Sequence, residues 1–473
     1  MKGDAMKQRR PAIGLLGLTL ELYETLAPAL RTGREAWVKR ALLPALKPLA
    51  DVRFSRAVNT AEGIAAAVRG FEADDLDAIL VICLSYSPSQ LALPALQRTH
   101  LPILVWNTQE LPAVDSTFGA AEMVENHGVH GTQDLCNVLL RNEVRFAYVT
   151  SHLHDPEGLS GLARFFAAAA AVRALRAVRV GLLGYPFPGM GDFAVDSTRL
   201  AATLGCQCTQ IAVEDYIRHA ASAPPAAVRK LVADYRQTYA VRGDVTDEDL
   251  DATARAELSL RHLVRTYRLD ALSFQFMAFG EHERTETVPF VAASRMMAEG
   301  IGFAGEGDAI GAIGTWLLNR LSPPASFSEM FTIDFAGNGV FMSHMGEANP
   351  ALARPNRRIA LVARPEPITR TRKRQLALVP EFRPGPATLC ALSQGPGHRW
   401  RLVVSPVLVR EFRPRPSLPV PQFMIAPATG DVRDWLTRYA QAGGPHHNAI
   451  CFGDARPLLR TLAPLLAADY CEV

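Results

Sequence analysis

The sequence predicts an α/β protein in which two doubly wound α/β domains are followed by a β-rich, barrel-like C-terminal domain. Up to residue 325, short apolar runs alternate with helical patterns, which is typical of parallel strands that helices cover on both faces. After Pro323 and Pro324 the apolar segments become short and are separated by proline and glycine, as in antiparallel β structure. We therefore expect domains at residues 1–177, 178–325 and 326–473.

The N-terminal domain is expected to begin with a strand at residues 12–18 and to continue as alternating helices and strands. The run AILVICL at residues 78–84 is apolar throughout, as expected for a parallel strand buried on both faces. The other strands are expected at residues 51–57 and 102–107, and the helices at residues 23–46, 60–71, 89–97, 122–141 and 158–177.

The central domain repeats this alternation, and the C-terminal domain does not. In the central domain we expect strands at residues 178–183, 209–213 and 271–276, and helices at residues 197–204, 247–267, 289–299 and 309–321. In the C-terminal domain we expect strands at residues 326–335, 339–344, 358–363, 375–379, 387–393, 400–409 and 449–452, and one helix at residues 432–442.

Composition excludes several classes of protein. The 473 residues carry 50 Lys and Arg against 47 Asp and Glu, a net charge of +3, which is too balanced for a protein that coats nucleic acid. Hydrophobic residues make up 48% of the chain, which excludes a disordered chain. The seven cysteines lack the spacing of a disulfide framework or a zinc ribbon, which favours a reducing compartment.

Two further segments are predicted to be structural. The apolar residues 12–20 run into acidic residues without a small-residue cleavage site, so we expect a strand there and no signal peptide. The basic residues 370–374 are expected to form a solvated turn. No apolar run reaches the roughly 20 residues that span a bilayer, so we expect a cytoplasmic protein with neither a membrane nor nucleic acid as partner.

The glycine-rich residues 303–308 contain a candidate catalytic acid. Their spacing matches neither a dinucleotide-binding fingerprint nor a phosphate-binding loop. Glu306 lies between two glycines, and we expect it at the N-terminus of the following helix. Either it is a functional carboxylate or it is an acid that the helix dipole favours there.

A second candidate acid, Glu329, is predicted to lie in a hairpin strand. Strand alternation places it on one face with Phe327, Phe331, Ile333 and Phe335, where an unpaired carboxylate would be costly. If the residues 337 and 338 form a two-residue loop, position 329 pairs with position 346. The imidazole at position 344 is then its diagonal neighbour, about 7–8 Å away.

Two further imidazoles, His446 and His447, follow a Gly-Gly-Pro loop at the entry to an apolar strand. A lone buried histidine is usually a core residue, but a pair after such a loop is a reasonable candidate for metal ligation. Carboxylate and imidazole ligands without cysteine favour Mn²⁺, Mg²⁺ or Co²⁺ over structural zinc. The residues alone leave open which of the two histidines binds.

The chain resembles the L-arabinose isomerase family and, more distantly, the L-fucose isomerases. The resemblance is carried by residues 295–308, the Phe-x-Glu-x-Phe-Thr strand at residues 327–332, Ser343-His344-Met345 and the late Gly-Gly-x-His-His. It implies one Mn²⁺, with Co²⁺ or Mg²⁺ as alternatives, bound by the four residues Glu306, Glu329, His344 and His447. It also implies an aldose–ketose isomerase in which Glu306 and Glu329 move a proton between C1 and C2 through a cis-enediol. A hydride-shift route stays open.

Weaker matches concern the sugar-binding residues. The resemblance implies that the sugar is lined by Leu22, Tyr23, Tyr86, His130, Met190 and Phe279. Tyr86 and His130 resemble residues that enter the site from a neighbouring subunit, which implies a homo-oligomer (a hexamer, or a trimer or tetramer). Core packing is the alternative interpretation for Leu22, Met190 and Phe279.

Two departures from the family pattern concern the substrate. Leu20 stands where the family has a glutamine, and His127 replaces a second glutamine. Groups that recognise sugar hydroxyls have therefore changed, whereas the expected metal ligands have not. One alternative is the same chemistry on another pentose, a deoxysugar or a modified hexose. The alternative from another class is a non-catalytic sugar-binding protein with the same fold.

Overall fold

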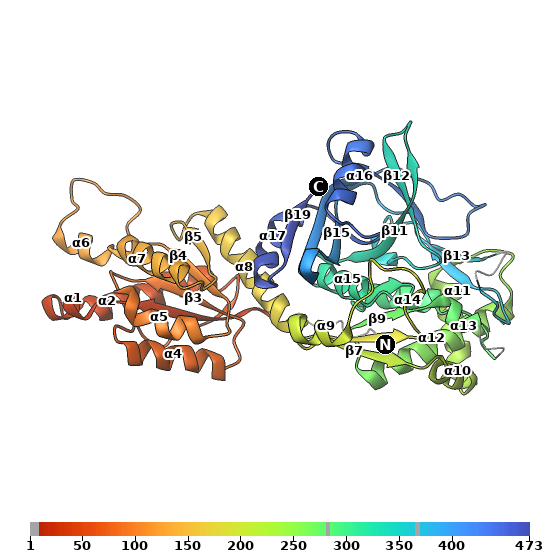
Figure 1. Ribbon diagram of the computed structural model, residues 1–473, viewed down its shortest axis with the longest axis horizontal. Helices are drawn as coiled ribbons and strands as arrows, with labels where there is room; N and C mark the ends of the chain where they lie inside the picture. Colours follow the sequence, from red (N-terminus) through yellow and green to blue (C-terminus); the bar gives the residue numbers. More distant parts are fainter. Residues whose placement is uncertain (1–8, 281–283, 365–368) are drawn as a thin grey trace. The chain divides into compact units, whose positions relative to one another are not determined.

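The structure is a computed structural model that describes residues 9–280, 284–364 and 369–473. The chain forms two compact units, a smaller one that ends at Arg173 and a larger one that continues from Ala174 to Val473. Each unit contains a parallel sheet with helices packed on it, and the larger unit also contains an antiparallel barrel (Figure 1). The predicted fold class is therefore confirmed. The division of residues 174–473 into two domains stays a prediction.

The smaller unit alternates strands and helices. Its strands are β1 (Ala12–Leu18), β2 (Asp51–Arg53), β3 (Ala78–Cys83), β4 (Ile103–Asn107) and β5 (Ala147–Thr150). Its helical segments are α1 (Glu21–Leu26), α2 (Leu30–Trp37), the π-helical η1 (Val38–Leu42), α3 (Leu43–Leu46), α4 (Ala61–Ala73), α5 (Ser89–Arg98), α6 (Ala120–Glu125), α7 (Gly128–Arg141) and α8 (Pro156–Leu175). All strands are parallel in the order β2-β1-β3-β4-β5, and every residue of β1 and β3 is buried.

Some predicted elements of this unit have the wrong extent. The predicted helix 23–46 is interrupted after α1, because Pro28 has no backbone N–H with which to continue the helix. The predicted strand 51–57 ends at Arg53. The predicted helix 122–141 is divided at His127, whose backbone is not helical (φ −85°, ψ 28°) and which precedes α7.

In the larger unit, a four-stranded parallel sheet has the order β10-β9-β6-β7. Its strands are β6 (Arg179–Leu183), β7 (Gln207–Ile211), β9 (Ala271–Phe274) and β10 (Gly302–Gly305). The helices of this region are α9 (Ser197–Leu204), α10 (Val213–Ala221), α11 (Pro225–Thr238), α12 (Asp247–Tyr267), α13 (Phe276–Gly280), α14 (Phe290–Ala298) and α15 (Ala309–Leu321). The sequence prediction missed β10, α10 and α11.

The remaining strands form a closed barrel and a small sheet. The barrel strands are β11 (Ala325–Asp334), β12 (Gly339–Ser343), β15 (Gly385–Gln394), β16 (Trp400–Val409), β17 (Gln422–Pro427) and β18 (His447–Phe452). They follow the order β15-β18-β11-β12-β17-β16, and pairing of β15 with β16 closes the barrel, as predicted. β19 (Asp469–Glu472) extends β16, and β8 (Ala240–Val241), β13 (Ala360–Ala363) and β14 (Leu376–Val379) form a separate sheet. The short helical segments are α16 (Val432–Gln441), α17 (Arg456–Leu465), η2 (Pro350–Leu352) and η3 (Pro396–His398).

Helix α15 connects the two sheets of the larger unit. It packs against β9 and β10 of the parallel sheet and against β11, β15 and β18 of the barrel. Almost all of its apolar residues are buried, as expected for a helix with sheets on opposite sides. Figure 1 shows it below the barrel strands. Its N-terminus therefore lies where the parallel sheet and the barrel meet.

The predicted register of the β11–β12 hairpin is wrong. A two-residue loop would pair Glu329 with Gly346, whereas the structure pairs Glu329 with Ser343. The connection between the strands is longer, and a β-bulge lies between Met330 and Thr332. A bulge adds one residue to one strand and changes which face the following side chains occupy.

The aromatic face predicted for β11 is buried at one end only. Phe327 is fully buried, and Glu329 is half-buried. Beyond the bulge, Phe331, Ile333 and Phe335 expose 45%, 40% and 54% of their surface. The part of β11 inside the larger unit is therefore the part around Glu329.

Two other segments bear on the expectation that neither a membrane nor nucleic acid is a partner. α8 is long and apolar enough to cross a bilayer, but 56% of its apolar window is buried, and core helices of soluble proteins have the same composition. The basic turn at residues 370–374 is not simply solvated, because Lys373 and Arg374 form ion pairs with Glu248 and Asp249.

Candidate metal centre

Glu306 lies in the tight turn between β10 and α15. It lies just before the N-terminus of the following helix, because α15 begins at Ala309, as predicted, and the side chain of Asp308 caps it. Glu306 has a left-handed backbone with φ of 62°, and its carbonyl oxygen accepts a hydrogen bond from the Phe187 N–H at 2.9 Å. Such a conformation costs a non-glycine residue about 1–3 kcal/mol and is typical of functional sites.

The glycines beside Glu306 make this turn possible. A Cβ atom at Gly305 would lie 2.3 Å from Cε1 of His344, so the imidazole packs directly on the backbone there. Gly307 has φ of 80°, and a Cβ atom on it would lie 2.5 Å from the carbonyl oxygen of Tyr185. The two glycines therefore allow the turn to lie against the barrel on one side and the loop after β6 on the other.

The barrel brings three further residues to this turn. β11 lies between β12 and β18, and Glu329 pairs directly with His447 on β18. On the other side Glu329 pairs with Ser343, and His344 is the next residue along the chain. The two imidazoles are almost fully buried, with 1% and 3% exposed surface. Phe327 packs edge-on against both rings.

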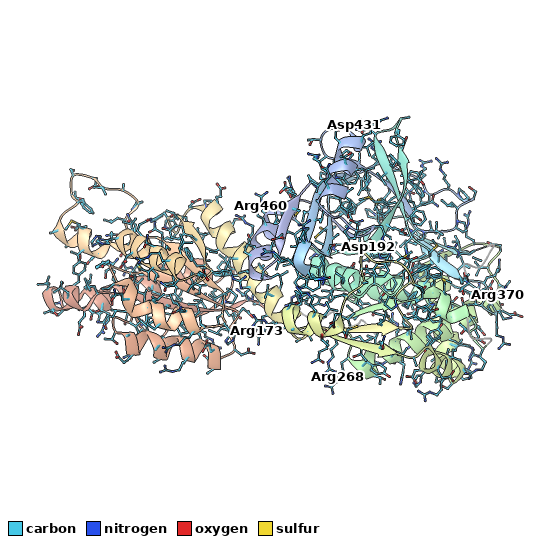
Figure 2. All side chains as sticks on the ribbon, in the orientation of Figure 1. Arg173, Asp192, Arg268, Arg370, Asp431 and Arg460 are labelled. Atoms are coloured by element: carbon cyan, nitrogen blue, oxygen red, sulfur yellow. The ribbon has the colours of Figure 1, made fainter. Side chains whose placement is uncertain are left out.

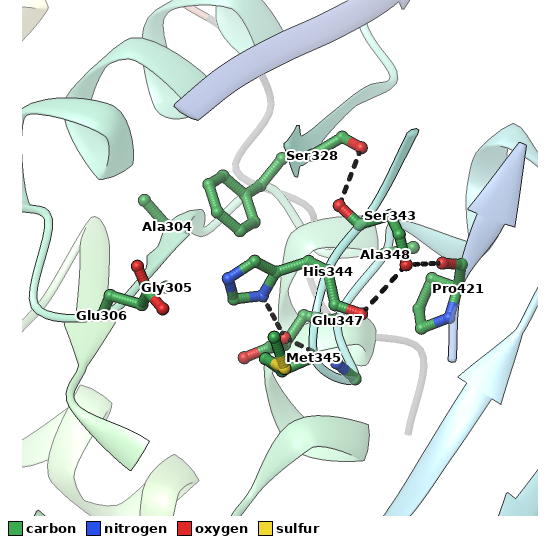
Figure 3. A network of polar contacts seen from close by, with 12 residues as sticks. Ala304, Gly305, Glu306, Ser328, Ser343, His344, Met345, Glu347, Ala348 and Pro421 are labelled. Carbon is green, nitrogen blue, oxygen red and sulfur yellow. Dashed lines mark hydrogen bonds and ion pairs between the residues drawn. The ribbon is translucent and has the colours of Figure 1, made fainter. Parts of the chain in front are cut away.

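A buried carboxylate orients each of these imidazoles. Nδ1 of His344 lies 2.7 Å from Oε2 of Glu347, and Nδ1 of His447 lies 3.0 Å from Oδ2 of Asp308. Figure 3 shows the contact with Glu347 and the ring of His344 turned towards Glu306. A carboxylate at Nδ1 fixes the tautomer so that the Nε2 lone pair is available, which is the usual arrangement around a metal-binding histidine.

The atoms that face one another lack other partners. Nε2 of His344, Nε2 of His447 and Oε2 of Glu306 are buried and have no hydrogen-bond partner. Ligand atoms of Glu329, His344 and His447 lie within 4.8 Å of one another. Oε2 of Glu306 lies 3.5 Å from Nε2 of His447. Because unpaired buried polar atoms are costly, this donor set fits a divalent cation held by two carboxylates and two imidazoles.

The pKa values of the carboxylate and the imidazoles show that their charges are complementary. Burial raises the pKa of Glu306, but the imidazoles of His446 and His447 outweigh it and hold that pKa at about 2. Burial lowers the pKa of His447, but Asp308 and Glu306 outweigh it and raise that pKa to about 9. The carboxylate is therefore ionised at neutral pH, and a cation must displace a proton from the imidazole to bind.

His446 lies beside this group and has its own partner. Its Nδ1 lies 2.6 Å from Oδ2 of Asp192, and its Nε2 lies 3.7 Å from Oε2 of Glu306. Ligand atoms of Glu306, His446 and His447 also lie within 4.8 Å of one another, so His447 belongs to both candidate groups. Burial lowers the pKa of His446, but Asp192 and Glu306 outweigh it and raise that pKa to about 10.

Three of the expected sugar-lining residues and His127 come together in a second group, which lies in the smaller unit. The hydroxyl of Tyr23 lies 3.0 Å from Nδ1 of His127, and Nε2 of His127 lies 3.1 Å from Nδ1 of His130. The ring of Tyr86 lies 4.3 Å from that of His130. These side chains come from α1, the segment after β3 and α7, so the fold itself gathers them.

The other three expected sugar-lining residues differ in their surroundings. Leu22 exposes 59% of its surface, so it is not a core residue of its unit. Phe279 is fully buried and packs edge-on against Tyr216 and Phe274, which matches the core-packing interpretation. Met190 is half-buried in the loop after β6. Their roles in binding stay predictions.

Sequence reasoning missed the residues that support the centre. Asp192 and Phe193 follow a proline- and glycine-rich loop, and Asp308 precedes a helix, so none of the three stands out in the sequence as part of a site. Glu347 follows His344 by three residues, a spacing that carries no signal by itself. Figure 2 labels Asp192, which lies within the outline of the larger unit.

Comparison with known proteins matches the larger unit to the L-arabinose isomerases. Residues 190–320 match the model of the L-arabinose isomerase central domain, and residues 324–469 match that of the C-terminal domain. The L-arabinose isomerase of Nocardioides sp. is 28% identical over 82% of this chain and 78% of its own. That of Mycolicibacterium smegmatis is 27% identical over 92% and 88%.

A solved periplasmic solute-binding protein of Actinobacillus succinogenes with bound D-allose covers 57% of this chain at 14% identity. Its TM-score is 0.16, which is too low to support an argument.

The matched domain models and the relatives identify this α/β and barrel protein as an enzyme of the isomerase class. The matched domains cover most of the larger unit, and the relatives cover most of the chain. The chain belongs to the L-arabinose isomerase family.

Proposed function

We propose that this protein is a metal-dependent aldose–ketose isomerase that acts on an open-chain sugar of the L-arabinose type. The observation that carries the proposal is that Glu329, His344 and His447 form one group and that Glu306 faces His447 beside it, while Nε2 of both imidazoles and Oε2 of Glu306 lack other partners. The relatives named L-arabinose isomerase support the reaction type.

The four residues would hold a divalent cation, with Mn²⁺ as the first candidate and Co²⁺ or Mg²⁺ as alternatives. When bound, the cation supplies Lewis-acid stabilisation of charge that develops on the sugar oxygens. Glu347 and Asp308 keep the two imidazoles in the tautomer that presents Nε2. Phe327 and Phe193 cover the histidine rings and exclude water from them.

The proton transfer is assigned to the two carboxylates. Glu306, a carboxylate beside the centre, accepts a proton from C2 of the aldose. The resulting cis-enediol receives a proton at C1, and the hydroxyl proton of O2 passes to O1, which gives the ketose. Glu329, half-buried beside the same centre, is the partner acid or base. A hydride shift from C2 to C1 gives the same product and is the alternative route.

A substrate panel tests the reaction. Chelator-stripped protein, refilled with Mn²⁺, Co²⁺ or Mg²⁺ in separate samples, is incubated with aldoses and ketoses, and the product sugars are measured. We expect Mn²⁺-dependent interconversion of an aldose and its ketose, and loss of turnover in Glu306→Gln with metal still bound. Turnover near wild type in that variant would remove Glu306 from the mechanism.

The same chemistry on a different sugar is the second candidate. It is favoured by Leu20 and His127, which stand where the family has glutamines. Both change the groups available to sugar hydroxyls, so another pentose, a deoxysugar or a modified hexose is the expected substrate class. The panel decides between the candidates, since fastest turnover of L-arabinose would exclude this one.

We also propose a cytoplasmic homo-oligomer in which a neighbouring subunit supplies Tyr86 and His130 to each site. The gathering of Tyr23, Tyr86, His127 and His130 into one group of the smaller unit supports a shared role. A fully active monomer in analytical ultracentrifugation would contradict it. If no sugar were turned over although metal and sugar both bound, the protein would instead be a non-catalytic sugar-binding protein.

A further inference from the structure

His446 shares one feature with the imidazoles assigned to the cation and differs in another. Like His344 and His447, it has a carboxylate at Nδ1, here that of Asp192. Unlike them, it does not belong to the group that contains Glu329. Its Nε2 faces Oε2 of Glu306, and in the described part of the chain neither atom has a hydrogen-bond partner.

The loop after β6 holds His446 at several points. Oδ2 of Asp192 accepts a hydrogen bond from the backbone N–H of His446 at 3.1 Å and contacts its Nδ1 at 2.6 Å. The next residue, Phe193, stacks parallel on the ring of His447, with 5.3 Å between the ring centroids, and lies 5.8 Å from His446. One oxygen of Asp192 thus fixes both the backbone and the ring of His446.

Glu306 needs such a partner. Its Oε2 is buried without a hydrogen-bond partner and lies 3.5 Å from Nε2 of His447 and 3.7 Å from Nε2 of His446. A carboxylate oxygen has two lone pairs, so Oε2 can bind a cation and also accept a hydrogen bond from an imidazole. Its neighbour Gly305 has no side chain to offer, and Asp308 is already engaged with His447 and with the N–H of Gly311. Within the described residues, two imidazoles lie next to Oε2 of Glu306. One is that of His447, and the other is that of His446.

We propose that His446, braced by Asp192, is a positioning residue that sets the orientation of the Glu306 carboxylate at the metal centre. It acts through Glu306 and is not itself a ligand of the cation. The inference rests on the proposed role of Glu306, and it extends that role to a chain of contacts from Asp192 through His446 to Glu306.

A double-mutant cycle on metal affinity tests this chain of contacts. The variants His446→Gln and Asp192→Asn are made in the wild-type chain and in Glu306→Gln. The dissociation constant of Mn²⁺ is measured from free Mn²⁺ by electron paramagnetic resonance on chelator-stripped full-length protein. Exposed His100, replaced by glutamine, is the matched control.

In the wild-type background we expect each variant to weaken Mn²⁺ binding about tenfold, the lower end of what the loss of an orienting partner costs. In the Glu306→Gln background we expect a change of less than about twofold, because the carboxylate that His446 orients is gone. With substrate, kcat should fall while KM changes little.

Equal weakening in both backgrounds would overturn the proposal, because His446 would then act independently of Glu306, as a direct ligand would. No weakening in either background would also overturn it, since His446 would merely pack. If His446→Gln does not fold, as judged by circular dichroism, Asp192→Asn carries the test. Failure of every sugar to react would refute the proposed function but leave the Mn²⁺ cycle interpretable.

Discussion

At the scale of single residues, the close contact between the backbone of Gly305 and the imidazole of His344 fixes the geometry of the site. The ring of His344 lies against Gly305 with no room for a methyl group, and this contact leaves Nε2 directed towards the centre. Neither residue could be assigned this contact from sequence, because it joins β10 to the end of β12, elements of two different sheets.

Replacement of Gly305 by alanine tests that contact. The new Cβ would lie 2.3 Å from Cε1 and 2.7 Å from Nε2 of His344, so the ring must move away from the centre. We expect the free energy of unfolding to fall by about 1–3 kcal/mol, as for other overpacked sites, and Mn²⁺ affinity to fall with it. Chemical denaturation and Mn²⁺ titration measure the two effects.

Gly33→Ala is the matched control. No atom lies within 4 Å of a Cβ at this position in α2, so the substitution should stabilise the chain by about 0.5–1 kcal/mol and leave Mn²⁺ binding unchanged. Wild-type Mn²⁺ affinity in Gly305→Ala would show that His344 is not held by this contact.

At the scale of elements, sequence periodicity predicted long regular segments well and irregular ones badly. α9, α12, α15 and β16 have the predicted bounds, because their apolar patterns run without interruption. β10 was missed because its four residues, Gly-Phe-Ala-Gly, carry almost no strand signal. The hairpin register was wrong because a β-bulge leaves no trace in an alternating pattern.

The candidate site likewise has residues that the sequence could predict and residues that it could not. Glu306, Glu329, His344 and the His-His pair could be found from residue types and motifs. The choice between His446 and His447 could not be made from the residues, because it depends on which of them pairs with Glu329 across β11 and β18. The orienting carboxylates escaped notice because their role exists only when distant segments meet.

Helix α15 gives a test at this scale, because Asp308 has two functions. One oxygen accepts the Gly311 N–H as the helix N-cap, and the other contacts Nδ1 of His447. Asparagine caps helices as well as aspartate does, so above pH 9, where His447 is neutral, Asp308→Asn should change the free energy of unfolding by less than about 0.5 kcal/mol. It should nevertheless weaken Mn²⁺ binding about 10–100-fold.

Unfolding curves and Mn²⁺ titrations of Asp308→Asn measure the two effects. Asp196→Asn, an N-cap exchange at α9 away from the histidines, is the control for capping alone. If Asp308→Asn kept its Mn²⁺ affinity, Asp308 would be a helix cap and nothing more.

At the scale of the whole molecule, cation binding, protonation and stability are linked. Burial lowers the pKa of His447, but Asp308 and Glu306 raise it from 6.5 to about 9 in the cation-free chain. A group whose pKa is raised on folding contributes stability that is complete below pH 6.5 and is lost as the pH rises through 9. A cation at the proposed centre would bind the deprotonated ring, so the stability that it adds would grow over the same interval.

We therefore predict that the rise in Tm caused by saturating Mn²⁺ increases between pH 6.5 and pH 9. Differential scanning fluorimetry with and without Mn²⁺ at each pH measures it. In His447→Gln the Mn²⁺-dependent rise should be small and independent of pH. A rise in Tm that falls with increasing pH in the wild-type chain would contradict the assignment.

The four-ligand centre is tested most directly by calorimetric titration of Mn²⁺ into chelator-stripped full-length protein. We predict one ion per chain, and a loss of affinity of more than about a hundredfold in His447→Gln, since a ligand is removed outright. Unchanged stoichiometry and affinity in His447→Gln would show that the cation binds elsewhere, and the proposed reaction at this centre would fail with it.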